Sequence, residues 1–168
     1  MKEIFSRYSV RKFQDKQVEP EKVKKLLEAA MQAPSAGNQQ PWEFLVITNN
    51  ESKEAIARIC QYSKPILGAP LGIMVLQNSQ NLRYPECAQQ DLGAACENIL
   101  LEATHLGLGG VWMAIMDFKP LMQGIKEYFK LPAHIEGFAT IALGYPAESK
   151  TPRLRYDESR AHYENYGS

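Results

Sequence analysis

Apolar positions along the chain follow two different periods, and together they predict a domain of mixed helices and strands. Four segments repeat apolar residues at helical spacing, and four shorter apolar runs lie between turn-forming residues, as strands do. The expected helices are 20–33, 51–59, 89–106 and 119–130. The expected strands are 43–48, 71–77, 111–115 and 137–145. No repeat or linker divides the chain, so we expect one α+β domain over residues 1–168.

Several boundaries of these elements carry their own signals. Pro20 suits the first turn of a helix, Asn50 or Ser52 can cap the second helix, and Gly107 can end the longest one. Outside the periodic segments, residues 1–19 and the stretch after Pro146 show neither period. Both of these irregular stretches carry closely spaced arginines, which makes them candidates for binding rather than for packing.

Composition limits the partners more than the fold. Basic and acidic residues number 19 each, so no net field attracts nucleic acid or an anionic membrane. No apolar run reaches the roughly 20 residues that span a bilayer. The opening MKEIFSRYSVRKF carries charges where a signal peptide needs an apolar stretch. We therefore expect a cytoplasmic protein that binds neither nucleic acid nor membrane.

The cysteines and histidines show no spacing typical of a metal site or of a disulfide scaffold. The three cysteines form an odd set without a CxxC pair, and the three histidines are isolated from them and from one another. These residues are Cys60, Cys87, Cys96, His105, His134 and His162. We expect them to be packing or surface residues and expect no metal.

The first candidate for chemistry is the N-terminal run from Arg7 to Arg11. In an extended segment alternate residues share one side, so Arg7, Ser9 and Arg11 would point the same way. Two guanidinium groups with a hydroxyl between them suit a phosphate and the polar edge of a ring. The alternative is an ordinary solvated basic terminus.

The second candidate is the loop PSAGNQQPW at 34–42, between a predicted helix and a predicted strand. Such a loop exposes backbone N–H groups and side-chain amides, and its two prolines restrict its motion. Asn38 can both donate and accept hydrogen bonds, as a cofactor's polar edge or sugar hydroxyls require. The alternative is a plain turn, and Trp42 is expected to anchor the core in either case.

A third candidate is the pair Arg153 and Arg155 near the C-terminus. A surface charge pair is the simpler interpretation when these residues are considered alone. Together with Arg7 or Arg11 they could enclose a phosphate.

These segments, taken in order, resemble the nitroreductase family of FMN-binding oxidoreductases. The resemblance rests on SRYSVRKF at 6–13, APSAGNQQPWEFLVI at 33–47 and ALGYPAE at 142–148, with GLGGVWM at 107–113 as weaker support. It covers nearly the whole chain. It implies a mixed, mostly antiparallel sheet flanked by helices, in an intertwined homodimer with two FMN sites at the interface.

The resemblance also assigns roles to the basic residues. Arg7 and Ser9 match positions that contact the FMN phosphate and ribityl chain. Arg11 matches a position where a cation lies near the pyrimidine edge of the flavin. Arg153 and Arg155 match a C-terminal basic pair on the phosphate.

The remaining assignments concern the flavin ring. Pro34, Ser35 and Asn38 belong to the loop that, in the family, reaches the flavin and its ribityl chain from the partner subunit. Met113 and Ala114 match a stretch where main-chain groups approach the ring, including an N–H directed toward N5.

Because a flavin carries out the chemistry itself, the resemblance requires no catalytic side chain. It implies that NADH or NADPH reduces FMN and then gives way, in a ping-pong sequence, to an electron-poor acceptor such as a nitroaromatic or a quinone. No GxGxxG fingerprint is present, so the choice between NADH and NADPH stays open. A specialised flavoenzyme of the same fold and a non-catalytic flavin-binding dimer remain as alternatives.

Two departures from the family bear on the substrate. The chain is short and lacks an evident helical lid, and no acidic side chain lies in the strand around Met113.

Overall fold

A computed structural model describes residues 2–116 and 118–167. The helices are α1 (Glu3–Ser6), α2 (Pro20–Met31), α3 (Asn50–Ile59), α4 (Ala88–His105) and α5 (Lys119–Tyr128). The strands are β1 (Trp42–Ile47), β2 (Leu71–Asn78), β3 (Gly109–Ala114) and β4 (Ile135–Gly144). Short 3-10 helices are η1 (Ala36–Asn38), η2 (Gln61–Gly68), η3 (Pro85–Cys87) and η4 (Glu158–Arg160). No helix among these described residues is long and apolar enough to cross a membrane.

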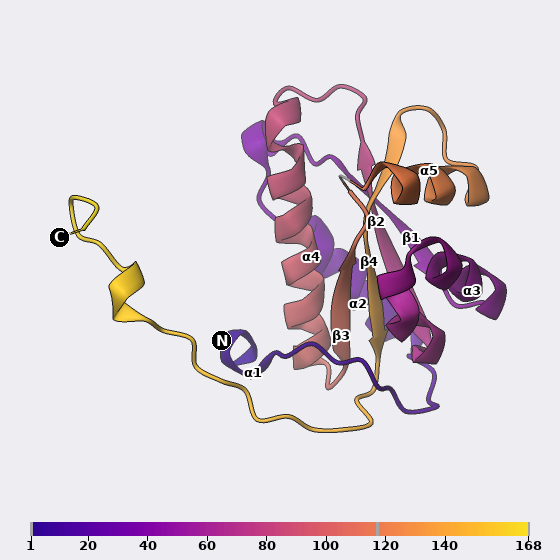
Figure 1. Ribbon diagram of the computed structural model, residues 1–168, viewed down its shortest axis with the longest axis horizontal. Helices are drawn as coiled ribbons and strands as arrows, with labels where there is room; N and C mark the ends of the chain where they lie inside the picture. The colour runs from indigo at the N-terminus through magenta and orange to yellow at the C-terminus, as the bar shows by residue number, and fades with distance from the viewer. Residues whose placement is uncertain (1, 117, 168) are drawn as a thin grey trace.

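The four strands form one antiparallel sheet in the order β1-β2-β4-β3. Helices cover both of its faces, which gives three layers (Figure 1). α2 and α4 pack on one face, and α3, η2 and α5 on the other. β2 and β4 lie in the centre of the sheet, so they are apolar at nearly every position, as the run at 71–77 predicted. β3 is an edge strand, and its open edge becomes important for binding.

Each face of the sheet has its own hydrophobic core. Leu26, Leu92 and Ile99 are fully buried between α2, α4 and the sheet, and Trp42 packs against them as expected. On the other face, fully buried residues such as Ile56 lie among α3, η2 and α5. Burial of a side chain of this size stabilises the fold by about 1.5–3 kcal/mol relative to exposure. Two such cores make the body a rigid support for surface segments.

The N-terminal segment lies along the open edge of β3. Val10 donates its backbone N–H to the Gly110 carbonyl at 3.0 Å, and a parallel bridge joins Ser9 to Gly110. Further on, an antiparallel bridge joins Phe13 to Pro146. A side chain at Gly109 would collide with Val10, so the glycine is what permits the close approach. These contacts pin residues 9–13 to the body.

The C-terminal segment behaves in the opposite way. From Ser149 on the residues are almost all exposed. The end of the chain runs outward past α1 and lies far from the sheet (Figure 1). Leu154 and Tyr156 are 82% and 79% exposed, so they add nothing to the core of their own chain. We call residues 149–167 the C-terminal tail.

The predicted helices and strands are confirmed, with boundaries shifted by a few residues. Two details were wrong. Residues 3–6 form a short helix that the irregular pattern did not predict. The second helix begins at Asn50 and is capped by Asn49, whose side chain accepts a hydrogen bond from the Ser52 N–H at 2.7 Å, because an Asx cap needs the residue before the first helical turn.

Candidate functional site

Several cavities, with volumes of about 360 to 840 Å³, open on the surface of this fold. Two of them are lined by predicted binding residues. The first lies between η2, β3 and the start of α5 and has a volume of about 610 Å³. It falls in the size range of small-molecule sites. We call it the β3 pocket. Its lining comprises Arg11, Cys60, Gln61, Tyr62, Ser63, Pro65, Val111, Trp112, Met113, Ala114, Phe118, Pro120 and Leu121.

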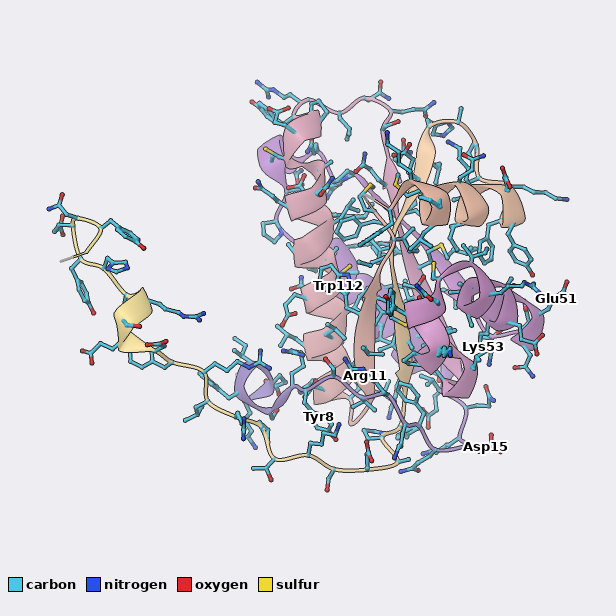
Figure 2. All side chains as sticks on the ribbon, viewed as in Figure 1. Tyr8, Arg11, Asp15, Glu51, Lys53 and Trp112 are labelled. Atoms are coloured by element: carbon cyan, nitrogen blue, oxygen red, sulfur yellow. The ribbon has the colours of Figure 1, made fainter. Side chains whose placement is uncertain are left out.

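The walls of the β3 pocket are mainly apolar, and Arg11 is the one charged residue among the described residues that line it. Figure 2 labels Arg11 on the N-terminal segment where that segment passes β3, with Trp112 farther along the strand. Burial raises the pKa of the Cys60 thiol, so this cysteine stays protonated and unreactive at neutral pH. The pocket therefore suits a planar apolar ring with one electron-rich edge near Arg11.

The open edge of β3 supplies a backbone donor to this pocket. Ile115 donates its N–H to Phe138 on the β4 side at 2.9 Å. Successive residues of a strand point their N–H groups to opposite sides, so the Ala114 N–H points away from β4, toward the open edge. Ala114 is exposed and lines the pocket. A ring in the pocket would meet a fixed N–H at this position.

The second cavity is basic and has a volume of about 840 Å³. It lies between the N-terminal segment and the start of the C-terminal tail. We call it the basic basin, and its lining comprises Ile4, Phe5, Arg7, Tyr8, Lys150, Thr151, Pro152, Arg153, Leu154, Arg155 and Tyr156. Arg7 pairs with Glu97 through Nε at 3.4 Å. A guanidinium has further N–H donors, so this ion pair orients Arg7 and leaves its other donors available to an anion.

The two cavities are joined by the N-terminal segment, with Arg7 in one and Arg11 in the other. Four residues of extended chain span about 13 Å. Ser9 lies between them and is half-buried, while Val10 points into the body. A ligand with a ring at one end and a phosphate at the other, as FMN has, fits this arrangement of an apolar pocket with one cation and a separate cluster of cations.

The loop 34–42 lies elsewhere, beside the N-terminal end of α4 and on the opposite face of the sheet from η2 and α5 (Figure 1). The buried carboxylate of Asp91 holds it in place. Asp91 accepts hydrogen bonds from the Ala36 N–H at 3.0 Å and from the Gln39 side chain at 2.7 Å. Gln39 also bonds both the N–H and the carbonyl of Tyr84. The loop is thus preformed, with Pro34 and Asn38 exposed.

The structure brings some predicted residues together and separates others. Arg11, Met113 and Ala114 share the β3 pocket, and the two C-terminal arginines share the basic basin with Arg7. The loop residues line neither cavity. Within the loop, the Ser35 hydroxyl accepts a hydrogen bond from the Gln40 N–H at 3.1 Å. One chain therefore holds two of the three predicted segments near its pockets.

Sequence patterns did not reveal several residues of the site. Tyr62 and Phe118 line the β3 pocket and are 84% and 56% exposed. Both lie in segments that looked like ordinary connections.

Asp91 lies within a long amphipathic helix, where an acidic residue normally indicates the solvated face. One signal was available in the sequence. Asp91 lies in the first turn of the helix, on the side of the apolar stripe, where an acidic residue indicates a buried hydrogen-bonding role.

Comparison with known proteins gives this site a family. The model of the nitroreductase family matches residues 4–65 and 62–145, so the chain belongs to that family. A protein of Methanothermobacter thermautotrophicus, provisionally named NADH dehydrogenase/NAD(P)H nitroreductase, is 39% identical over 97% of this chain and 85% of its own length.

Solved structures agree with this assignment. A crystal structure from Clostridium acetobutylicum, provisionally named as an NADH oxidase, is 42% identical, with a TM-score of 0.94 over 98% of this chain and 99% of the other. A nitroreductase from Desulfovibrio desulfuricans, provisionally named and solved in complex with FMN, is 30% identical, with a TM-score of 0.85 over 98% and 95% of the two chains. The predicted fold, helices flanking a mostly antiparallel sheet, is thereby confirmed, whereas the homodimer stays a prediction.

Proposed function

We propose that this protein is an FMN-dependent oxidoreductase that uses NADH or NADPH to reduce small electron-poor acceptors such as nitroaromatics and quinones. The observation that carries the proposal is the pair of cavities joined by residues 7–11, one apolar with a single arginine and one basic. The family and the FMN complex of a relative support the same cofactor. When bound, FMN supplies the two-electron chemistry that links the nicotinamide donor to the acceptor.

The residues of this chain then bind and orient. Arg7, Arg153 and Arg155 would hold the phosphate, because guanidinium groups donate paired hydrogen bonds to phosphate oxygens. Arg11 would face the pyrimidine edge of the ring and favour negative charge there. The Ala114 N–H would donate to a ring nitrogen and fix the height of the ring. Tyr62 and Phe118, at the exposed rim, would stack against the donor and the acceptor in turn, as a ping-pong sequence requires.

The complete site needs two chains. We infer an intertwined homodimer in which Ser35 and Asn38 of one subunit approach the β3 pocket of the other. The loop carrying them is preformed but remote from both cavities of its own chain. The exposed apolar side chains of the C-terminal tail support the same arrangement, since they need a surface to cover them.

The absorption spectrum of the purified protein tests the cofactor. We expect a yellow protein that releases FMN rather than FAD on heating, because the basic basin suits one terminal phosphate. Anaerobic titration with NADH and with NADPH should then bleach the spectrum and identify the preferred donor. Menadione or a nitroaromatic should restore the colour. FAD, or no flavin after reconstitution, would defeat the proposal, and a bound flavin that does not turn over would favour a non-catalytic flavin-binding dimer.

Mixed dimers test the shared site. Subunits carrying Arg7→Ala are combined with subunits carrying Asn38→Ala, and FMN binding is measured on the isolated heterodimer. If the sites are shared, one site carries both defects and the other recovers wild-type affinity. Two weakened sites, each with the defect of one variant, would show that each chain builds its own site, and the dimer proposal would fail.

A further inference from the structure

A lysine on α3 is buried without a counter-charge. Lys53 is 6% exposed, and its ammonium donates to the Ala69 carbonyl at 3.1 Å. Among the described residues, no carboxylate lies within ion-pair distance of it. Glu51, two residues earlier, is exposed at the outer edge of α3, whereas Lys53 lies against the body (Figure 2). Buried charges are normally paired, because leaving water is costly for an ion.

Lys53 lines a cleft of about 390 Å³ that the β3 pocket does not include. We call it the Lys53 cleft. The other residues lining it are Phe13, Gln14, Asp15, Gln17, Asn50, Leu67, Gly68, Ala69 and Pro70. Asn50 begins α3, so the positive end of this helix lies at the cleft. The ammonium has three donors and one is engaged, which leaves donors for a further acceptor.

We propose that the Lys53 cleft binds an oxyanion, a carboxylate or a phosphate, against the Lys53 ammonium. Such a group provides the missing negative charge and accepts the remaining N–H donors, and the amides of Gln17 and Asn50 lie in the same lining. Asp15 is the one acidic residue among the described residues of this lining. The negative charge of Asp15 disfavours an anion at the edge of the cleft, but Asp15 does not form an ion pair with Lys53.

The cleft and the β3 pocket are lined by neighbouring parts of the same two chain segments. In the N-terminal segment, Arg11 lines the pocket and Phe13 lines the cleft. In η2, residues up to Pro65 line the pocket and residues from Leu67 line the cleft. On the proposed function, an aromatic acceptor that carries a carboxylate would place its ring beside the flavin and its carboxylate at Lys53. This extension to substrates rests on the proposed function, whereas oxyanion binding at Lys53 does not.

Phosphate binding to the full-length protein tests the site. The protein is saturated with FMN, so that the basic basin is filled, and inorganic phosphate is titrated calorimetrically. Because a charge-assisted hydrogen bond is lost, Lys53→Gln should weaken phosphate binding about tenfold or more. The matched control Lys24→Gln, at an exposed position of α2, should bind as wild type does. Equal affinity in wild type and Lys53→Gln, or no binding by wild type, overturns the proposal.

A second variant leaves the buried lysine untouched. Asp15 is exposed, so Asp15→Asn should fold normally, and removal of its negative charge should tighten phosphate binding several-fold. Unchanged affinity in this variant would contradict a phosphate in the Lys53 cleft, even if Lys53→Gln failed to fold.

Turnover separates the two sources of the oxyanion. If the acceptor carries it, Lys53→Gln should raise KM for 4-nitrobenzoate about tenfold and leave KM for nitrobenzene unchanged. Equal effects on both acceptors, with phosphate binding still dependent on Lys53, would assign the cleft to a free oxyanion and overturn its role in acceptor selection. Absence of any turnover would defeat the proposed function, whereas the phosphate titration would still decide the cleft.

Discussion

The N-terminal segment 7–13 and the C-terminal tail are both basic, and both carry predicted contacts to the same ligand. Residues 9–13 are pinned by a backbone hydrogen bond and by bridges to Gly110 and Pro146. The C-terminal tail leaves the body, and its large side chains are mostly exposed (Figure 1). The same residue type therefore sits in two different settings: Arg11 lines a pocket from a backbone that is already pinned, whereas the tail arginines are exposed on a segment that lies away from the body.

This difference has an energetic consequence. A preformed contact costs little entropy on binding, so it can orient a ring closely. A segment with few contacts to the body loses conformational freedom when it docks, so its contacts mainly decide whether the ligand stays. We expect changes in the C-terminal tail to alter FMN affinity and changes along the pinned segment to alter geometry and chemistry.

The largest effect is expected from the tail. Arg153→Ala together with Arg155→Ala should weaken FMN binding at least about a hundredfold, because each charge-assisted hydrogen bond contributes roughly 1.5–3 kcal/mol. Turnover should return close to wild type when FMN is supplied in excess. Fluorescence titration of FMN and saturated kinetics measure the two quantities. Normal affinity in the double variant would remove the tail from the site.

A substitution in β3 can displace the pinned segment that lies beside this strand. In Gly109→Ala the new methyl group meets Val10, so the unfolding free energy should fall by about 1–3 kcal/mol, and FMN should bind more weakly as Arg11 shifts. Gly68→Ala is the control, because its methyl group enters open space at an ordinary backbone conformation. Denaturant unfolding measures the first effect. Identical stability in the two variants would show that Gly109 is not what permits the contact.

Arg11 separates chemistry from retention. Arg11→Ala should lower the reduction potential of bound FMN, since a positive charge beside the pyrimidine edge favours the electron-rich reduced ring. Flavin reduction by NAD(P)H should slow even at saturating FMN, unlike in the tail variants. Potentiometric titration measures the shift. An unchanged potential with normal saturated turnover would mean that Arg11 has a different role.

The smallest effect is expected in β4, next to β3. Thr140 pairs with Met113 across the sheet, and its buried hydroxyl has no hydrogen-bond partner among the described residues. Thr140→Val should therefore raise the unfolding free energy by about 1 kcal/mol, or roughly 2–4 °C in Tm for a chain of this size. FMN affinity should stay as in wild type. A loss of stability would show that the hydroxyl has a partner, such as an ordered water.

Many residues of the candidate site could be predicted from short sequence motifs and from their order along the chain. Arg7, Arg11 and the tail pair stood out because each lies in a stretch without helical or strand period, where packing does not explain a basic residue. Tyr62 and Phe118 gave no such signal, since an aromatic residue in a connecting segment looks like a packing residue until its exposure is known. The roles assigned to all the predicted binding residues stay predictions.

What the sequence determined by itself was local: the four main helices, the four strands and the family. These follow from periodicity and from motifs, which depend on neighbours a few positions apart. Tertiary structure alone decided which segments meet. It placed Arg11 at the open edge of β3, separated the loop 34–42 from both cavities and left Lys53 buried without a counter-charge. Such outcomes depend on contacts between residues far apart in the chain, and no local pattern records the distance between them.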